Sequence, residues 1–459
     1  MWRTLLSGPV SRLVAGRSFS PAQVLVISFV ALIAIGTVLL SLPIAAGRAP
    51  LSAIDALFMA TSAVAVTGLN VVDTPNDLSL FGQLVLLLLI QLGGLGYMAV
   101  TTVVGVALGR ALTVHERLTL QEAMNVQTMD GLRRFVGTVL KLTLAFEVTG
   151  AAILTLHWMG EYGLARAAYY GVFHAVSAFN NAGFALFPDS LMRFRGDWIV
   201  NAVITGLVIA GGLGFVVLTE LKRARSYRQL TIHTRLVLML TAGFSVAATI
   251  VILLIERRNP ATLGPLGFTE ALLAAFFQAV TPRTAGFNTL DIGAMMPASL
   301  FVILILMFIG AAPGGTGGGV KITTFSITVA VIWAMVRGRA EPTLLRRRLA
   351  PVLVARAFSI CLLGFLALNV VAGLLMVFEG RQLVPSLFEA TSAFGTVGLS
   401  TGEAGAPISL AGHFSAGGKL LLVGMMFMGR VGPLTLAVAI ARGARPARIR
   451  YPEGQFLVG

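Results

Sequence analysis

The segment that decides the fold is Phe388-Glu-Ala-Thr-Ser-Ala-Phe-Gly-Thr-Val-Gly398, a helix-like run that ends in a glycine turn. Three variants occur earlier: Phe58-Met-Ala-Thr-Ser-Ala-Val-Ala-Val-Thr-Gly68, Phe173-His-Ala-Val-Ser-Ala-Phe-Asn-Asn-Ala-Gly183 and Phe277-Gln-Ala-Val-Thr-Pro-Arg-Thr-Ala-Gly286, the last being one residue shorter. Their glycines lie 103 to 115 residues apart. Each copy is too short to span a bilayer, which takes about 20 helical residues. The spacing therefore predicts four internal repeats, each with one short helix and a glycine turn.

The composition indicates an integral membrane protein. Of 459 residues, 56% are hydrophobic and only 12% are charged, against roughly 25% charged in a soluble domain. A single cysteine, Cys361, excludes a disulfide within the chain and a cysteine-based metal cluster. The chain has no HExxH motif, and its one GxSxG match, Gly398-Leu-Ser-Thr-Gly402, follows a helix-like run rather than a strand, which argues against metallohydrolase and α/β-hydrolase chemistry of those types. The net charge of +15 indicates basic cytoplasmic loops rather than nucleic-acid binding.

A long apolar segment lies before and after each copy of the pattern. The preceding segments are residues 22–42, 136–158, 235–255 and 352–378, and the following ones are 80–108, 198–218, 299–336 and 418–441. The first is too long for the apolar region of a signal peptide and is predicted to be a transmembrane helix. We therefore expect an all-α polytopic protein with eight spanning helices and four re-entrant loops around a pseudo-fourfold pore. The expected parts are a tail (1–20), pore repeats 1 to 4 (21–109, 110–221, 222–336 and 337–441) and a second tail (442–459).

The distribution of basic residues predicts the orientation in the membrane. With both termini in the cytoplasm, 21 of the 34 basic residues fall in cytoplasmic stretches and seven in external ones. The remaining six lie in or beside membrane segments. This bias agrees with the positive-inside rule, and it makes all four loops enter from the outer face.

Four re-entrant glycine loops predict a cation pore. Each short helix would direct its C-terminal end, with about half a negative charge, at the centre. Glycine beyond that end adopts positive φ easily, and rings of carbonyl oxygens can replace the hydration shell of a monovalent cation. The loops contain no carboxylate, which argues against divalent selectivity by an acidic ring. Glycine-rich segments can also serve only to pack helices closely, but four copies between spanning segments favour the pore.

The predicted selectivity filter takes three residues from each loop. They are Val66, Thr67, Gly68, Asn181, Ala182, Gly183, Thr284, Ala285, Gly286, Thr396, Val397 and Gly398. Potassium is expected at the carbonyls of Thr67, Asn181, Thr284 and Thr396.

A gate is predicted in the third repeat, at Gly310-Ala-Ala-Pro-Gly-Gly-Thr-Gly-Gly-Gly-Val320. An interior glycine costs a helix about 1 kcal/mol and a proline about 3 kcal/mol, so this helix should break in mid-membrane. Val320 before Lys321 distinguishes the run from a nucleotide-binding P-loop. Milder glycine clusters occupy residues 93–96 and 211–214. The predicted gate residues are Gly310, Pro313, Gly314, Gly315, Thr316, Gly317, Gly318, Gly319, Lys321 and Arg430.

Arg430 should complete this gate. It falls near the middle of the last apolar segment, where an isolated charge costs at least about 2.5–3.5 kcal/mol. The hypothesis is that it donates hydrogen bonds to carbonyls of loop 310–320 and places positive charge below the filter. The alternative is a purely structural pairing with an acid in the membrane.

Four other polar residues in apolar segments are expected to be structural. Arg283 should face away from the pore axis, braced by carbonyls or an acid behind its loop. Glu147 and Lys141 are six residues apart and do not share a helix face, so packing roles are preferred to a proton relay. His174 is interpreted as an interior histidine rather than a ligand.

These motifs resemble a known family. Asn180-Asn-Ala-Gly-Phe184, Arg283-Thr-Ala-Gly-Phe-Asn288, Ala312-Pro-Gly-Gly-Thr-Gly-Gly-Gly319 and Arg430 are similar to the pore-forming subunits of the Trk/Ktr/HKT superfamily of potassium transporters. The short segment before the first helix and the ending Arg450-Tyr-Pro-Glu453 resemble the Ktr type rather than the Trk type. With glycine at all four filter positions, the resemblance favours potassium over sodium.

The resemblance also implies partners and a location. It implies a homodimer in the bacterial plasma membrane and a cytoplasmic octameric ring of KtrA-type regulatory subunits. ATP or ADP is expected only on that ring, and no cofactor is expected to be covalently bound to this chain. Sodium stimulation is frequent in Ktr-type systems, and no residue here decides it. The basic stretches Lys222–Arg225 and Arg346–Arg348 could dock the ring, or could instead set topology and attract anionic lipid.

Two other function classes fit less well. An ion-coupled secondary transporter of a small solute would have inverted repeats and a midplane pocket, whereas these four repeats run in one direction. For an intramembrane enzyme, no pair of catalytic residues can be named. Whether transport is channel-like or coupled to sodium or protons stays open from the sequence.

Overall fold

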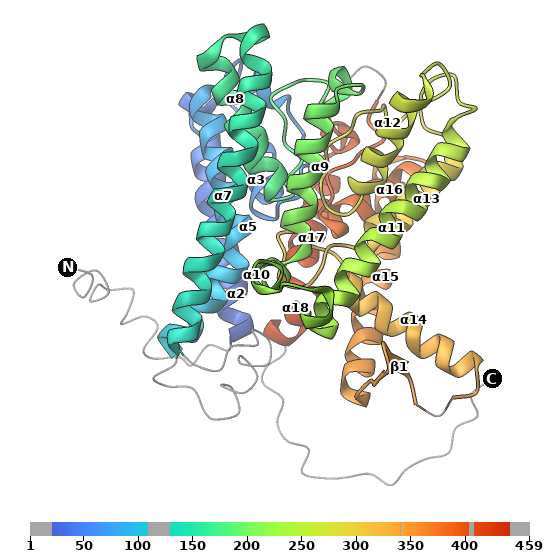
Figure 1. The fold of residues 1–459 in the computed structure, drawn as a ribbon. Helices are drawn as coiled ribbons and strands as arrows, with labels where there is room; N and C mark the ends of the chain where they lie inside the picture. The colour runs from blue at the N-terminus through green and yellow to red at the C-terminus, as the bar shows by residue number, and fades with distance from the viewer. Residues whose placement is uncertain (1–20, 109–128, 340, 404–407, 441–459) are drawn as a thin grey trace.

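The computed structural model describes residues 21–108, 129–339, 341–403 and 408–440. It is built of helices that run roughly side by side around a central region (Figure 1). The predicted tails 1–20 and 442–459, and the basic residues of 110–128, lie outside the described residues.

Each repeat contains a long helix, a short helix and a second helix that is continuous or broken. Repeat 1 has α2 (Pro21–Ser41), α3 (Ala53–Val64) and α5 (Leu80–Leu108), and repeat 2 has α7 (Met129–Tyr162), α8 (Leu164–Phe179), α9 (Trp198–Leu213) and α10 (Phe215–Arg223). Repeat 3 has α11 (Ile232–Glu256), α12 (Phe268–Val280), α13 (Pro297–Phe308) and α14 (Ile322–Val336), and repeat 4 has α15 (Pro351–Glu379), α16 (Leu383–Gly395), α17 (Ala416–Val431) and α18 (Pro433–Ile440). The predicted helical architecture is confirmed, and these four sets of helices are consistent with the predicted repeats.

Short elements fill the connections. They are η1 (Pro43–Ala45), α4 (Thr74–Asp77), η2 (Met192–Phe194), η3 (Tyr227–Gln229), η4 (Leu410–His413) and a hairpin of β1 (Thr343–Leu344) with β2 (Arg347–Arg348). The hairpin pairs antiparallel, with Thr343 opposite Arg348, and its two turn residues, Leu345 and Arg346, have positive φ. This turn presents the basic Arg346–Arg348 stretch as an exposed tip.

The first helix of each repeat is long and apolar enough to cross a membrane, and these helices are α2, α7, α11 and α15. The predicted break in repeat 3 is confirmed, because α13 ends at Phe308 and α14 begins at Ile322. The sequence predicts uninterrupted spans at 198–218 and 418–441, but the structure has a break in each of them. The chain bends by 100° between α9 and α10 and by 98° between α17 and α18.

Glycine at positive φ causes both of these bends. Gly214 has φ of 91° and Gly432 has φ of 93°, a conformation that no helix contains. Pro433 follows the second one and begins α18, where its missing N–H costs nothing. Gly93 and Gly94 lie inside the continuous helix α5, so the milder cluster in repeat 1 does not break its helix. Arg430 consequently lies at the C-terminal end of α17 rather than in mid-helix.

Helix ends are fixed by side-chain caps on the connecting loops. The side chain of Ser52 accepts a hydrogen bond from the N–H of Asp55 at the start of α3. Asp197 and Ser415 cap α9 and α17 in the same way. Each such cap contributes about 1 kcal/mol, and together they help to fix where α3, α9 and α17 begin.

Glycines on the second helices allow the short helices to pack against them at backbone distance. An added Cβ at Gly93, Gly211 or Gly429 would lie less than 3.0 Å from the carbonyl oxygen of Val64, Phe179 or Phe394, respectively. These carbonyls belong to the last turns of α3, α8 and α16. The short helices are thus held in place by close backbone contact, as in membrane helix interfaces with small residues.

We expect Gly429→Ala to destabilise the protein. Overpacking at a site that cannot relax costs about 1–3 kcal/mol, so the thermal unfolding temperature in detergent should fall. Gly424→Ala on the same helix is the matched control, because an added Cβ there has nothing within 4 Å. Equal unfolding temperatures for the two variants would contradict the proposed packing.

Candidate functional site: a ring of glycine loops with an outer cavity and an inner loop

The four loops share one backbone conformation. In each, two residues with positive φ are separated by one residue. The first of the two is Val66, Asn181, Thr284 or Thr396, and the second is Gly68, Gly183, Gly286 or Gly398. Alternation of this kind turns neighbouring backbone groups towards one side of the chain. Positive φ in a β-branched residue is a strained conformation typical of functional sites.

The four loops form a closed ring. An added Cβ at Gly68, Gly183, Gly286 or Gly398 would lie less than 3.0 Å from the carbonyl oxygen of Ala182, Ala285, Val397 or Thr67, respectively. The contacts thus run from repeat 1 to 2, 2 to 3, 3 to 4 and back to 1. Repeats 2 and 4 therefore lie opposite each other, as do repeats 1 and 3.

This geometry changes the register expected for the ion-binding carbonyls. The expected set of Thr67, Asn181, Thr284 and Thr396 mixes two levels. Val66 is the equivalent of Asn181, Thr284 and Thr396 by its positive φ. Thr67 belongs with Ala182, Ala285 and Val397, the carbonyls that contact the neighbouring glycines. The mismatch lies in the first copy, which carries Val66 where the others have a polar residue, although counting two residues back from each glycine gives the equivalent set.

Hydroxyl groups of the short helices hold the loops. Ser62 and Ser392 accept hydrogen bonds from the N–H groups of Gly68 and Gly398, both at 3.1 Å. Ser177 and Thr281 instead donate to the carbonyls of Phe184 and Phe287, at 2.8 and 2.5 Å. Each loop is thereby tied to its own helix, so the backbone of the ring is pre-formed.

Arg283 and Glu147 lie behind the ring. Arg283 is buried and its Nη1 donates to the carbonyl of Thr241 on α11, at 3.3 Å. This agrees with the expectation of a carbonyl brace. Glu147 accepts a hydrogen bond from Asn180 Nδ2 at 3.1 Å, so it links α7 to the end of the second short helix.

A cavity of about 510 Å³ opens above the ring. All four loop glycines, Gly68, Gly183, Gly286 and Gly398, line it, together with the segments that follow them. It also contains one carboxylate from each repeat, namely Asp73, Asp189, Asp291 and Glu403. The loops contain no carboxylate, as the sequence indicates, but an acidic residue follows each glycine by five or six positions. That repeated spacing is a signal in the sequence that the analysis of the loops alone did not use.

Within the part of the chain that the structure describes, two of these acids are paired with arginines and two are not. Asp189 forms an ion pair with Arg193, and Glu403 one with Arg381, both at 2.7 Å. Asp73 accepts from Asn76 at 2.6 Å, and Asp291 accepts from the N–H of Gly293. The cavity therefore has a net negative field that can concentrate cations.

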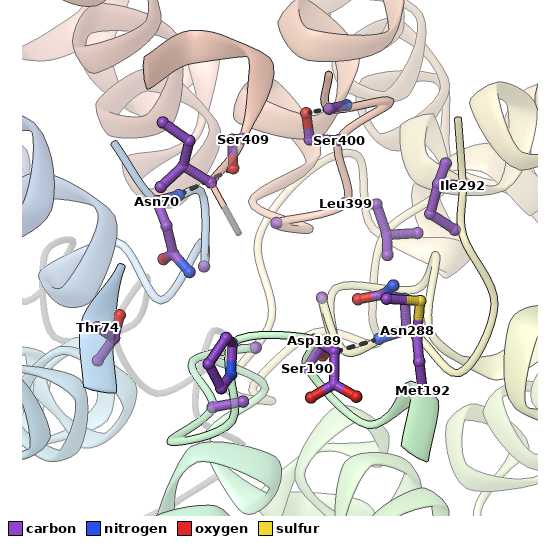
Figure 2. A pocket seen from close by; sticks show the side chains of 18 of the residues that line it. Asn70, Thr74, Asp189, Ser190, Met192, Asn288, Ile292, Leu399, Ser400 and Ser409 are labelled. Atoms are coloured by element: carbon purple, nitrogen blue, oxygen red, sulfur yellow. Dashed lines mark hydrogen bonds between the residues drawn. The ribbon is translucent and has the colours of Figure 1, made fainter. Parts of the chain in front are cut away.

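Two hydrogen-bonded links join neighbouring repeats at the cavity wall, and Figure 2 shows both. Asn70 and Ser409 are joined by two hydrogen bonds, from Asn70 N to Ser409 Oγ at 2.9 Å and from Ser409 N to Asn70 O at 2.8 Å. Asn288 N donates to Ser190 Oγ at 3.3 Å, and Leu191 N donates to Asn288 O at 3.1 Å. Repeat 1 is thus fixed to repeat 4, and repeat 2 to repeat 3.

Acidification of the outer medium should reduce cation entry through Asp73. Burial raises the pKa of Asp73, and the neighbouring Asp77 raises it to a lesser degree. These effects outweigh the Asn76 hydrogen bond and the charge of Arg48, both of which lower the pKa. Asp73 therefore takes up a proton at a higher pH than an ordinary aspartate, whose pKa is near 3.9. When Asp73 is protonated, the cavity loses one negative charge. We expect initial rubidium influx at sub-saturating concentration to fall by about twofold as this group protonates.

The Asp73→Asn variant provides the check on this pH effect. Its influx should be low from the start and less dependent on external pH. Asp291→Asn is the matched control, because it removes one negative charge from the same cavity. A wild-type pH profile in Asp73→Asn would contradict the assignment.

Loop 310–320 lies directly against the inner side of the ring. An added Cβ at Gly317 or Gly318 would lie less than 3.0 Å from the Oγ1 of Thr284 or Thr396, respectively. Gly318 N donates to Thr396 Oγ1 at 3.0 Å. Two of the four residues with positive φ before the ring glycines are thus in contact with this loop.

Backbone hydrogen bonds attach loop 310–320 to the other two broken helices. The N–H groups of Ala312 and Thr316 donate to Gly212 and Gly211 at 3.0 and 3.1 Å, and the N–H of Gly319 donates to Gly429 at 3.1 Å. Irregular backbone at this depth needs such partners because no water is available in hydrocarbon. The three breaks therefore form one assembly below the ring.

Arg430 joins three repeats at this assembly. Its Nη1 donates to the carbonyl of Thr316 in the loop. Its Nη2 donates to Gly93 O on α5, at 2.5 Å, and to Gly94 O, at 3.3 Å. The hydrogen bond expected between Arg430 and the loop is present, and the C-terminal end of α17 stabilises the positive charge. Lys321 Nζ donates to Gly317 O, which adds a second cation at this level.

The fold and this site define a class of protein: a helical membrane protein in which one chain supplies a ring of four glycine loops. The comparisons agree with this class. A family model described as "TrkH: Cation transport protein" matches residues 12–445, and the chain belongs to this family of cation transport proteins. It is therefore a transport protein and not an enzyme.

Two relatives share sequence over almost the whole chain. Ktr system potassium uptake protein B of Bacillus subtilis is 42% identical over 443 residues, which cover 96% of this chain and 97% of the relative. The protein of the same name from Vibrio alginolyticus is 37% identical and covers 95% of this chain and 94% of its own length. The solved structure of the potassium transporter TrkH from Vibrio parahaemolyticus matches with a TM-score of 0.73 at 18% identity, over 93% of this chain and 86% of that one. That last similarity shows the shared fold.

Proposed function

We propose that the chain is the pore-forming subunit of a Ktr-type potassium uptake system. The observation that carries this proposal is the closed ring of four glycine loops at the floor of an acidic cavity. In this arrangement a monovalent cation loses water and binds to peptide oxygens from four repeats. The names of the relatives that match over their full length support potassium as the ion.

Two stacked levels of carbonyls would hold the ion. The outer level consists of the carbonyls that pack against the glycines, from Thr67, Ala182, Ala285 and Val397. The inner level consists of those of Val66, Asn181, Thr284 and Thr396, next to loop 310–320. The negative ends of α3, α8, α12 and α16 approach the same region and favour a cation there.

Loop 310–320 and Arg430 would form the gate below this filter. The loop contacts Thr284 and Thr396 from the inner side, so an ion leaving the filter meets it next. Arg430 holds the loop through Thr316 and adds positive charge to the path. Opening would require the loop to release these hydrogen bonds and move aside.

The partners expected for such a subunit are a second copy of the chain and a cytoplasmic KtrA-type octameric ring that binds ATP or ADP. The word "system" in the relatives' names supports additional components. The exposed basic stretches Lys222–Arg225 and Arg346–Arg348 are suited to contact an acidic ring surface or anionic lipid. Sodium stimulation and cytoplasmic termini in the bacterial plasma membrane belong to the same proposal.

Growth of a bacterium that lacks potassium uptake tests the proposal. Expression of this chain, with the ring subunit supplied from the same operon or a relative, should restore growth at low external potassium. The rescued cells should take up radioactive rubidium, and excess potassium should suppress that uptake. Uptake of an uncharged solute by the purified chain, without any rubidium flux, would instead favour a secondary transporter.

A further inference from the structure

One buried position recurs in all four short helices and the ion pathway above does not use it. It directly follows the phenylalanine that begins each copy of the pattern, and its occupants are Met59, His174, Gln278 and Glu389. All four side chains have 0% exposure. A buried polar side chain is costly without hydrogen-bond partners, so three polar residues at one position in four repeats require an explanation.

His174 holds the segment that leaves the filter in repeat 2. Its Nδ1 lies 2.7 Å from the carbonyl of Tyr170 and must donate to it. Its Nε2 is then the acceptor for the N–H of Leu186, at 3.3 Å. The neutral ring therefore connects α8 to a residue three positions beyond Gly183.

Glu389 has the same role in repeat 4. It accepts a hydrogen bond from Ser400 Oγ, two positions beyond Gly398. Ser400 Oγ in turn accepts from the N–H groups of Gly402 and Leu410, at 3.0 and 2.8 Å. Ser400 lines the outer cavity, and it lies near the Asn70–Ser409 link to repeat 1 (Figure 2).

The other two repeats lack this connection. Met59 has no polar group that could make a hydrogen bond to the segment beyond Gly68. The amide of Gln278 has no partner for either its nitrogen or its oxygen among the residues that the structure describes. Since repeats 2 and 4 lie opposite each other in the ring, the two connections form a diagonal pair.

We propose that His174 and Glu389 are positioning residues that fix the outer mouth of the filter from two opposite sides, and that they thereby set its selectivity among monovalent cations. The proposal rests on the filter assignment made above. A carbonyl ring discriminates between ions only while its oxygens keep their spacing, and the outward segments of repeats 2 and 4 determine that spacing at the mouth.

The test is the ratio of rubidium to sodium flux into liposomes that contain the full-length protein. Glu389→Met and His174→Met should each lower this ratio by about fivefold, the size expected from the loss of one hydrogen bond. Methionine is the residue that repeat 1 carries at this buried position, and it cannot make either hydrogen bond. Glu389→Gln keeps an acceptor oxygen for Ser400 and should restore the wild-type ratio.

Gln278→Met is the matched control and should leave the ratio unchanged, because that amide makes no hydrogen bond to lose. Unchanged ratios in folded Glu389→Met and His174→Met would overturn the proposal. An equal fall in Gln278→Met, or no restoration by Glu389→Gln, would also overturn it. If Glu389→Met does not elute as a folded protein on gel filtration, Ser400→Ala removes the same hydrogen bond and should lower the ratio. A wild-type protein that does not distinguish the two ions would refute the filter itself, which is a separate result.

Discussion

Replacement of Gly286 by alanine is expected to reduce rubidium uptake at least about tenfold and to impair selectivity against sodium. Gly286 has φ of 78°, and for a residue with a Cβ such a conformation costs roughly 1–2 kcal/mol, a factor of about ten in rate. The new Cβ would also press on the carbonyl oxygen of Val397 in the next repeat. The loss should thus affect the whole ring and not only one loop.

Uptake in the growth-rescue strain, with protein amount determined in the membrane fraction, measures this effect. Serine at Gly68, Gly183, Gly286 or Gly398 should act in the same direction, because each glycine packs on its neighbour in the same way. Gly243→Ala in α11 is the control, since an added Cβ there has nothing within 4 Å. Rescue and selectivity that are insensitive to all four changes would refute the filter assignment.

Replacement of Arg430 by alanine is expected to increase cation flux at least about tenfold in the chain purified without any partner protein. The variant removes a positive charge and a hydrogen bond to Thr316 from loop 310–320. Two like charges about 4 Å apart repel by about 4 kcal/mol at an effective dielectric constant of 20. A tenfold change in rate needs only about 1.4 kcal/mol, so the increase should be measurable even with partial screening.

The measurement is rubidium flux into liposomes. Arg430→Lys is the comparison variant, because lysine keeps the positive charge but lacks the paired, planar N–H donors of the guanidinium. Lysine should give an intermediate flux, because it cannot reach Thr316 and Gly93 together as the guanidinium does. A flux equal to or below that of the wild type, in Arg430→Ala protein that is folded and monodisperse, would show that Arg430 is not part of the barrier.

Much of the fold could be predicted from the sequence because its signals are local. The apolar segments have the length of a membrane span, and the four glycine patterns recur at similar intervals. The run at 310–320 contains more glycine than any helix tolerates, so its break was predictable from propensity alone. The bends at Gly214 and Gly432 were not, because the glycines near them are no denser than the cluster at 93–96, which lies inside the continuous helix α5.

The sequence by itself determined that this is a repeated, helical membrane protein with four glycine turns and one strongly broken helix. Only the tertiary structure decided which carbonyls share a level, that an acid from each repeat meets in one cavity, and that Arg430 joins three repeats. The reason is physical: helix length, hydrophobicity and glycine propensity depend on neighbouring residues in the chain. The level of a carbonyl and the partner of a buried charge depend on repeats that lie more than a hundred residues apart and meet only when the ring closes.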